Sequence, residues 1–139
     1  MRLPLFQLDA FAEKQFQGNP AAVCPLETWL PDELLQAIAA ENNLSETAFY
    51  VQEADGFRIR WFTPNKEVDL CGHATLAAAY VLRQQMPEIG PELTFHSRSG
   101  ALRVTESNGL LTLDFPAQVG VPASPPAILR EALGVNPLD

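Results

Sequence analysis

A cysteine, a glycine and a histidine open the most apolar run of the chain, EVDLCGHATLAAAYVL at residues 67–82. Gly72 permits a sharp turn from a strand into a helix and a close approach of other atoms to the backbone. The first turn of a helix presents unpaired N–H groups and partial positive charge, which suit a bound carboxylate. His73 would face the same pocket and could transfer protons near neutral pH. Cys71 would lie at the strand end, where the helix dipole can lower the pKa of a thiol.

Each of these residues also has a structural interpretation. Cys71 can be a small buried hydrophobe, and His73 a capping or hydrogen-bonded imidazole. Asp69, four residues before His73, is a candidate to orient the imidazole. Asp9, Asp69 and His96 otherwise have no local partner pattern, and we interpret them as structural by default.

Two other segments carry candidate site residues. Glu46, in NLSETAF at residues 43–49, lies where an amphipathic helix passes into an apolar strand, a usual place for a general base. The alternative is a surface or helix-terminal glutamate. Asn19, in FQGNPAAV, could donate its amide to a ligand carboxylate or simply hold a turn. Neither segment decides between these interpretations alone.

The hydrophobic pattern predicts the elements that must position these residues. Residues 31–42 form an amphipathic helix that begins at a proline. Residues 72–85 form a helix that is apolar on nearly all sides and must be enclosed by protein. The predicted strands are residues 3–10, 20–26, 46–52, 57–63, 92–97, 101–106 and 109–115.

Four prolines mark residues 116–126 as an extended linker, and residues 127–135 have a short helical pattern. A helix that follows such a linker normally opens a second unit. We therefore assign residues 1–116 to one lobe and residues 117–139 to a linker and the first helix of an absent second lobe.

The composition excludes several classes of function. The chain of 139 residues has a net charge of −8, which argues against binding to nucleic acid. It has no apolar stretch near the roughly 20 residues of a membrane span and no signal-peptide pattern. The two cysteines are widely separated, which predicts reduced thiols and a cytoplasmic protein. The spacing of the two cysteines and two histidines does not indicate a structural zinc site.

The order of the three motifs resembles one protein family. DAFAEKQFQGNPAAVC, then WLPDELLQAIAAENNLSETAF, then IRWFTPNKEVDLCGHATLAAAYVL look like the N-terminal half of the PhzF-like family, the phenazine-biosynthesis isomerase group. That group is related in fold to diaminopimelate epimerase. The resemblance extends over roughly residues 5–115.

The resemblance implies an α+β fold, a diaminopimelate-epimerase-like lobe with a curved mixed sheet wrapped around a central apolar helix. Family members have two such lobes with the active site between them. Glu46 matches the family's catalytic glutamate and His73 assists it, and the resemblance implies substrate binding by Gly72, Asn19, Ser45 and Cys71. The family's phenazine enzyme moves a proton between carbons of a dihydro-hydroxyanthranilate without cofactor or metal.

Three functions follow as hypotheses. The first is a cofactor-independent isomerase of a small carboxylic acid, completed by a second copy of the chain, as a homodimer, or by a separate second lobe. The second is a thiol-based epimerase or racemase that uses Cys71, since related epimerases carry a catalytic cysteine before the matching glycine. In those enzymes an asparagine follows the glycine, where this chain has His73. The third is a non-catalytic half-domain that binds a small acid or a partner chain.

Overall fold

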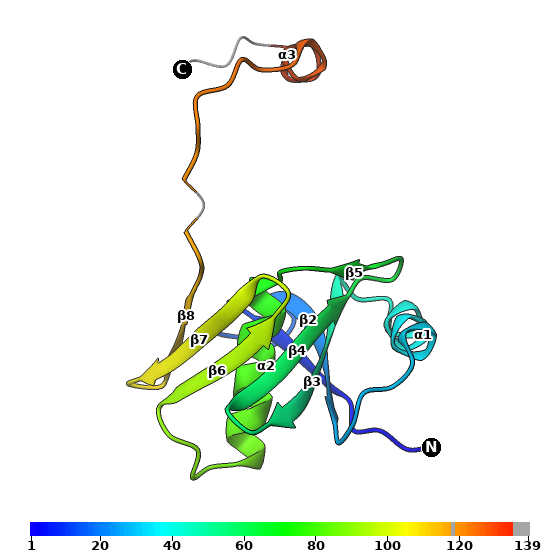
Figure 1. The fold of residues 1–139 in the computed structure, drawn as a ribbon, viewed down its shortest axis with the longest axis vertical. Coiled ribbons are helices and arrows are strands. Elements are labelled where there is room, and N and C mark those ends of the chain that lie inside the picture. The colour runs from blue at the N-terminus through cyan, green and yellow to red at the C-terminus, as the bar shows by residue number, and fades with distance from the viewer. Residues whose placement is uncertain (118, 135–139) are drawn as a thin grey trace.

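The computed structural model describes residues 1–117 and 119–134. Their strands form one sheet of eight (Figure 1). The strands are β1 (Phe6–Ala10), β2 (Asn19–Leu26), β3 (Glu46–Glu53), β4 (Gly56–Phe62), β5 (Glu67–Val68), β6 (Glu92–Ser97), β7 (Gly100–Ser107) and β8 (Leu110–Asp114). The helices are α1 (Asp32–Asn42), α2 (Gly72–Gln85) and α3 (Ala127–Leu133).

The sheet has the order β1-β2-β3-β4-β6-β7-β8, with β5 paired to β4. It is mixed, because β2 runs parallel to β3 and β4 runs parallel to β6, while the other pairs are antiparallel. Each parallel pair needs a crossover connection. Helix α1 supplies it between β2 and β3, and α2 lies in the connection from β4 to β6.

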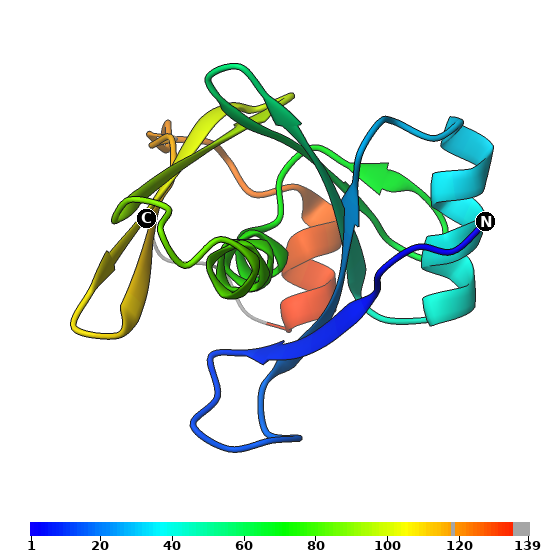
Figure 2. The ribbon, with the colours of Figure 1, turned by 90° about the horizontal axis from the view of Figure 1, so that it is seen from below.

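The sheet curls around α2, which contacts β1, β2, β3 and β8 (Figure 2). Small side chains on the helix allow this close enclosure, since Ala74, Ala77, Ala78 and Ala79 are all buried. Larger side chains of the strands fill the remaining space against them, among them Trp61, Phe95, Leu102 and Val104. The enclosure is not complete, because Tyr80, on one side of α2, is 50% exposed.

Helix α1 lies on the other face of the sheet (Figure 2). Leu35 and Ala39 pack there with Phe49 and Phe62, whose rings meet edge to face at a centroid distance of 5.6 Å. The two faces of β3 therefore serve two separate cores, which the alternation of side chains along a strand requires. Glu46 begins this strand on the face that looks toward α2.

The expected fold is confirmed: an α+β lobe in which a curved mixed sheet wraps around a central apolar helix. The predicted helices at 31–42 and 72–85 match α1 and α2. The first strand begins at Phe6 rather than at residue 3, and the two-residue strand β5 was not predicted. A strand this short has too few residues to show an alternating pattern.

The chain beyond β8 leaves the sheet (Figure 1). The described residues between 115 and 126 form no helix or strand, and no residue of α3 is buried. Helix α3 ends at Leu133, short of the predicted boundary at 135, which lies outside the described residues. The assignment of residues 117–139 to a second lobe stays a prediction. None of the helices in the described ranges has the length and hydrophobicity needed to cross a membrane.

Candidate active site

Glu46 is held in place by the junction between α1 and β3. Asn43 ends α1 in the left-handed conformation (φ 51°), which turns the chain back toward the sheet. The side-chain amide of Asn42 then donates to Oγ1 of Thr47 at 3.1 Å. Because Thr47 is buried on the α1 face, the preceding Glu46 must lie on the face toward α2.

The start of α2 is fixed by the backbone of Cys71. This residue is extended (φ −147°, ψ 112°) and is the N-cap of the helix. Its carbonyl oxygen accepts two hydrogen bonds from Thr75, one from the backbone N–H at 3.2 Å and one from the buried hydroxyl at 2.6 Å. These bonds set the direction in which the side chains of Cys71 and His73 project.

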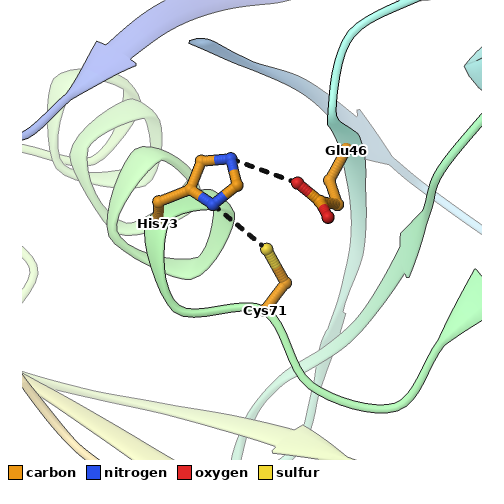
Figure 3. Close-up of side chains that lie close together, drawn as sticks. All are labelled: Glu46, Cys71 and His73. Atoms are coloured by element: carbon orange, nitrogen blue, oxygen red, sulfur yellow. Dashed lines mark hydrogen bonds and ion pairs between the residues drawn. The ribbon is translucent and has the colours of Figure 1, made fainter. Parts of the chain in front are cut away.

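Three side chains from these two places meet in one cluster (Figure 3). Nε2 of His73 lies 3.3 Å from Oε2 of Glu46, and Nδ1 of His73 lies 3.4 Å from Sγ of Cys71. One ligand-type atom from each residue lies within 4.8 Å of those from the other two. The imidazole therefore stands between a carboxylate and a thiol, with one ring nitrogen toward each.

The cluster is largely shielded from solvent. The side chain of His73 is 9% exposed and that of Glu46 is 20% exposed. Oε2 of Glu46 and Nε2 of His73 are buried, and neither atom has a well-aligned hydrogen bond among the described residues. Their separation of 3.3 Å is slightly longer than an ordinary hydrogen bond.

Of the two interpretations of Cys71, the structure favours the small buried residue over the thiolate. Burial raises the pKa of this thiol from 9.0 to about 12, and the Glu46 carboxylate adds to the rise. The backbone N–H groups of Ala74 and His73 do lower the pKa, as a helix N-terminus should, but burial outweighs them. Cys71 is therefore a neutral thiol at physiological pH.

A close approach to the backbone of Gly72 was predicted, and the structure shows one: an aromatic ring lies against this residue. A Cβ atom at this position would lie 2.5 Å from Cζ of Phe115. Phe115 follows β8 directly and remains 46% exposed. Its ring covers the first residue of α2, so it borders the cluster. Sequence reasoning missed Phe115, because no local pattern shows that β8 ends beside α2.

The other predicted residues lie around the cluster with different partners. Asn19 and Ser45 are exposed at the start of β2 and just before β3, at the end of the sheet where Glu46 lies. Within residues 1–117 and 119–134, neither side chain hydrogen bonds to the cluster, so their roles as substrate ligands stay predictions. The suggestion that Asp69 orients His73 was wrong, because the Asp69 carboxylate is 76% exposed and lies 3.9 Å from Arg98.

Two cavities of the described chain lie away from the cluster. One of about 300 Å³ is lined by Trp29, Asp32, Arg58, Ile59, Arg60, Ser97 and Arg98. A second lies between β1 and the exposed side of α2, at Leu8 and Tyr80. Neither includes Glu46, Cys71 or His73. The cluster thus has chemically active groups on one wall, and neither of these two cavities provides an opposite wall.

The arrangement can move a proton. A carboxylate can accept one, an imidazole can donate or accept one at either nitrogen, and a neutral thiol can donate one. The same three groups are also a donor set for a divalent cation.

Comparison with known proteins places the chain in a family. The family model described as phenazine biosynthesis-like protein, PhzC-PhzF, matches residues 8–131. An uncharacterised isomerase of Pseudomonas aeruginosa is 58% identical over 135 residues, which cover 97% of this chain and 52% of that protein. The chain spans about half the length of the curated relatives it matches.

Solved structures agree with this placement. A PhzF-family phenazine biosynthesis protein from Enterococcus faecalis superposes with a TM-score of 0.82 at 48% identity, covering 96% of this chain and 52% of that one. A protein of Pseudomonas aeruginosa described as a predicted epimerase gives a TM-score of 0.69 at 31% identity, over 80% of this chain and 41% of that one. The chain therefore belongs to the PhzC-PhzF family of phenazine biosynthesis-like proteins.

Proposed function

We propose that this lobe carries the proton-transfer machinery of a cofactor-independent isomerase that acts on a small carboxylic acid. Glu46 removes a proton from one carbon of the substrate, and the electron pair of the broken C–H bond shifts into the adjacent unsaturated system. The resulting carboxylic acid of Glu46 returns a proton to a second carbon. The double bond moves, and no electrons are gained or lost overall.

The observation that carries this proposal is the contact between Glu46 and His73. Their Oε2 and Nε2 atoms lie 3.3 Å apart in a largely buried setting. A proton taken up by Glu46 can pass to His73 and back, so the imidazole helps to hold it between the two steps. The membership of the PhzC-PhzF family and the isomerase name of a 58% identical relative favour the same chemistry.

The substrate carboxylate is proposed to lie at the start of α2. The partial positive charge of a helix N-terminus attracts an anion there. The N–H groups of His73 and Ala74 already act on the sulfur of Cys71, as their effect on its pKa indicates. The backbone N–H of Gly72, beneath the ring of Phe115, is therefore the donor we assign to the substrate.

A second wall is part of the proposal. The two cavities described above lie away from the cluster, and an isomerase must exclude water from its carbanion-like intermediate. We propose that a second lobe, or a second copy of this chain in a homodimer, closes over Glu46 and His73. Exposed apolar side chains favour such pairing, notably Phe115 and those of α3 at Ile128, Leu129 and Leu133.

The thiol-based epimerase is the weaker alternative. Its mechanism needs a thiolate as base and a second thiol as acid. With its pKa near 12, Cys71 is protonated at neutral pH. Cys24, the other cysteine, is buried in the core against α1 and donates to the carbonyl of Pro4 at 3.1 Å. The two thiols therefore do not face each other across one site.

The test of the proposed function is hydrogen exchange at carbon. The purified chain is incubated in deuterated water with a dihydro-hydroxyanthranilate, and deuterium incorporation is followed by NMR. We expect incorporation that Glu46→Gln lowers by roughly 10²- to 10⁴-fold, the usual contribution of a general acid–base group. Unchanged incorporation in Glu46→Gln would remove the carboxylate from the mechanism.

A matched control lies on the same strand. Glu53 ends β3, where its partly exposed carboxylate pairs with Arg58 at 2.8 Å. Glu53→Gln makes the same chemical change far from the cluster and should leave exchange unaltered. If the wild-type chain alone shows no exchange, the assay is repeated with the separately expressed C-terminal half of the Enterococcus faecalis protein. No exchange in that mixture would favour the third hypothesis, a half-domain that only binds.

A further inference from the structure

Three different metal-ligating groups converge at the start of α2. The carboxylate of Glu46, the thiol of Cys71 and the imidazole of His73 each have a ligand atom within 4.8 Å of the others. The spacing of the cysteines and histidines does not indicate a zinc site, and Glu46 lies far from Cys71 and His73 in the chain. The parallel pairing of β2 with β3 and the seat of α2 in the sheet bring them together.

The separation of Glu46 and His73 suits one small ion. Tetrahedral zinc, with bonds of about 2.0–2.1 Å to nitrogen and to a carboxylate oxygen, places those two ligand atoms roughly 3.4 Å apart. Oε2 of Glu46 lies 3.3 Å from Nε2 of His73. Sγ of Cys71 lies 3.4 Å from Nδ1, the opposite ring nitrogen, so the thiol must turn to join an ion at Nε2.

The polar atoms of the cluster also lack full hydrogen bonding. Oε2 of Glu46 and Nε2 of His73 are both buried without a well-aligned partner among the described residues. The His73 side chain is 91% buried, since 9% of it is exposed. Buried polar atoms of this kind call for a partner such as water, substrate or an ion.

We propose that Glu46, Cys71 and His73 form a chelating site for a thiophilic divalent cation of the zinc class, and that the bound ion blocks the proton shuttle. One imidazole nitrogen binds one ion, so the ion takes Nε2 beside the Glu46 carboxylate while the Cys71 side chain turns toward it. The Cys71 thiol releases its proton to solvent as it binds. Three protein ligands leave one position for water.

The donor set selects the class of metal. A thiol and an imidazole favour zinc and similar transition metals, whereas magnesium and calcium prefer oxygen ligands. The binding claim rests on the cluster alone. The inhibition claim rests on the proposed function, because an ion bound to the Glu46 carboxylate prevents that oxygen from accepting a proton from carbon.

The test is titration of the full 139-residue chain with Co²⁺ as a spectroscopic substitute for zinc. We expect one equivalent of Co²⁺ to give visible absorption as intense as that of tetrahedral Co²⁺ complexes. A near-ultraviolet thiolate-to-cobalt band should accompany it, and added Zn²⁺ should remove both. Cys24→Ser is the matched control, because it leaves Cys71 as the single thiol and should keep both bands. Cys71→Ser should abolish the thiolate band.

Affinity is measured by competition between Zn²⁺ and a chromophoric chelator. Cys71→Ser and His73→Gln should each weaken binding by more than the roughly 10- to 100-fold that the loss of an outer-shell partner costs. His96→Gln, which changes the half-buried histidine of β6, should not. Absence of the cobalt bands in the Cys24→Ser chain overturns the proposal without any change to the cluster itself.

Zinc is then added to the deuterium-exchange assay. Exchange that falls in proportion to zinc occupancy supports both parts of the proposal. Full exchange at saturating zinc would contradict the inhibition claim. Cobalt bands in a chain or mixture that performs no exchange would leave the metal site standing and count against the proposed function, so the two failures are distinguishable.

Discussion

Oε2 of Glu46 lies 3.3 Å from Nε2 of His73, although one residue begins a strand and the other lies in the first turn of a helix. The contact depends on two crossovers. Helix α1 connects β2 to β3 so that the two strands lie side by side, and α2 packs inside the curve of the same sheet (Figure 2). The contact is therefore a property of the whole lobe rather than of either segment.

The first prediction is that Glu46 and His73 stabilise each other. Glu46→Gln, His73→Asn and the double variant form a double-mutant cycle, measured by urea unfolding at pH 7. For a contact that is mostly buried, we expect a favourable coupling energy within about 0.5–3 kcal/mol. The coupling isolates the pair from the separate effects of each substitution.

A more exposed pair of the same kind provides the control. Nε2 of His96 lies 3.5 Å from Oδ2 of Asp55, whose side chain is 79% exposed. The cycle of Asp55→Asn and His96→Asn should give a coupling near zero, as exposed ion pairs usually do. A coupling between Glu46 and His73 no larger than this one would contradict the prediction.

The sequence predicted the fold and the members of the cluster through different kinds of signal. Alternation and helical periodicity gave the strands and helices, because burial imposes those periods on the apolar residues. Glu46, Cys71 and His73 were singled out by residue type at the junctions of these elements. The order of the three motifs, which matches that of the PhzF-like family, grouped these residues into one site. A single position such as Glu46 could equally be an ordinary surface glutamate.

What the sequence could not show depends on distant parts of the chain. The high pKa of Cys71 comes from burial by the sheet, whereas its local position at a helix start pointed the other way. Phe115 reaches Gly72 only because β8 is paired to β7 at the far side of the sheet. Asp69 looked like a partner of His73 by spacing, but it precedes the helix and points to Arg98 instead.

The second prediction concerns Gly72 and Phe115. In a helix interior, alanine is favoured over glycine by roughly 0.5–1 kcal/mol, and Gly72, as the first residue of α2, should gain less than this. At position 72 the Cβ of alanine would lie 2.5 Å from the ring of Phe115, which must move. We expect Gly72→Ala to stabilise the chain in a Phe115→Ala background by up to about 0.5 kcal/mol, and to stabilise the wild type less or not at all. Urea midpoints of the four chains measure this.

Gly90 serves as the reference glycine for that cycle, because nothing lies within 4 Å of a Cβ built there. Gly90→Ala should have the same effect with and without Phe115. If Gly72→Ala behaved in the same additive way, the ring of Phe115 would not be resting on the helix start in solution.

The third prediction is that the hydroxyl of Thr75 holds the start of α2. It donates to the carbonyl of Cys71 at 2.6 Å from a fully buried position. Thr75→Val keeps the shape and the branching of the side chain but removes this bond, which should cost about 1 kcal/mol. Thr112→Val on exposed β8 is the comparison and should change stability by no more than about 0.5 kcal/mol. Equal urea midpoints for the two variants would show that the hydroxyl contributes nothing.

The fourth prediction is a loss of stability in alkali that depends on Cys24. Burial raises the pKa of this thiol from 9.0 to about 11. Above pH 9 the unfolded chain ionises the thiol while the folded chain keeps it protonated, so ionisation lowers the free energy of the unfolded state relative to that of the folded state. The stabilising contribution of the neutral thiol is complete below pH 9 and is lost as the pH rises toward 11. At about 1.4 kcal/mol for each pKa unit, the loss is roughly 2–3 kcal/mol.

Cys24→Ala isolates this contribution. The substitution lowers stability at every pH because it removes buried volume, but it should flatten the decline between pH 8.5 and pH 11 relative to wild type. Urea unfolding at a series of pH values gives the two slopes. Tyr50, whose pKa burial also raises, contributes a decline of the same sign above pH 10 in both chains and cancels in the difference. Parallel slopes would mean that Cys24 ionises in the folded chain as readily as in the unfolded one. That result would contradict the rise in pKa that its burial beneath α1 causes.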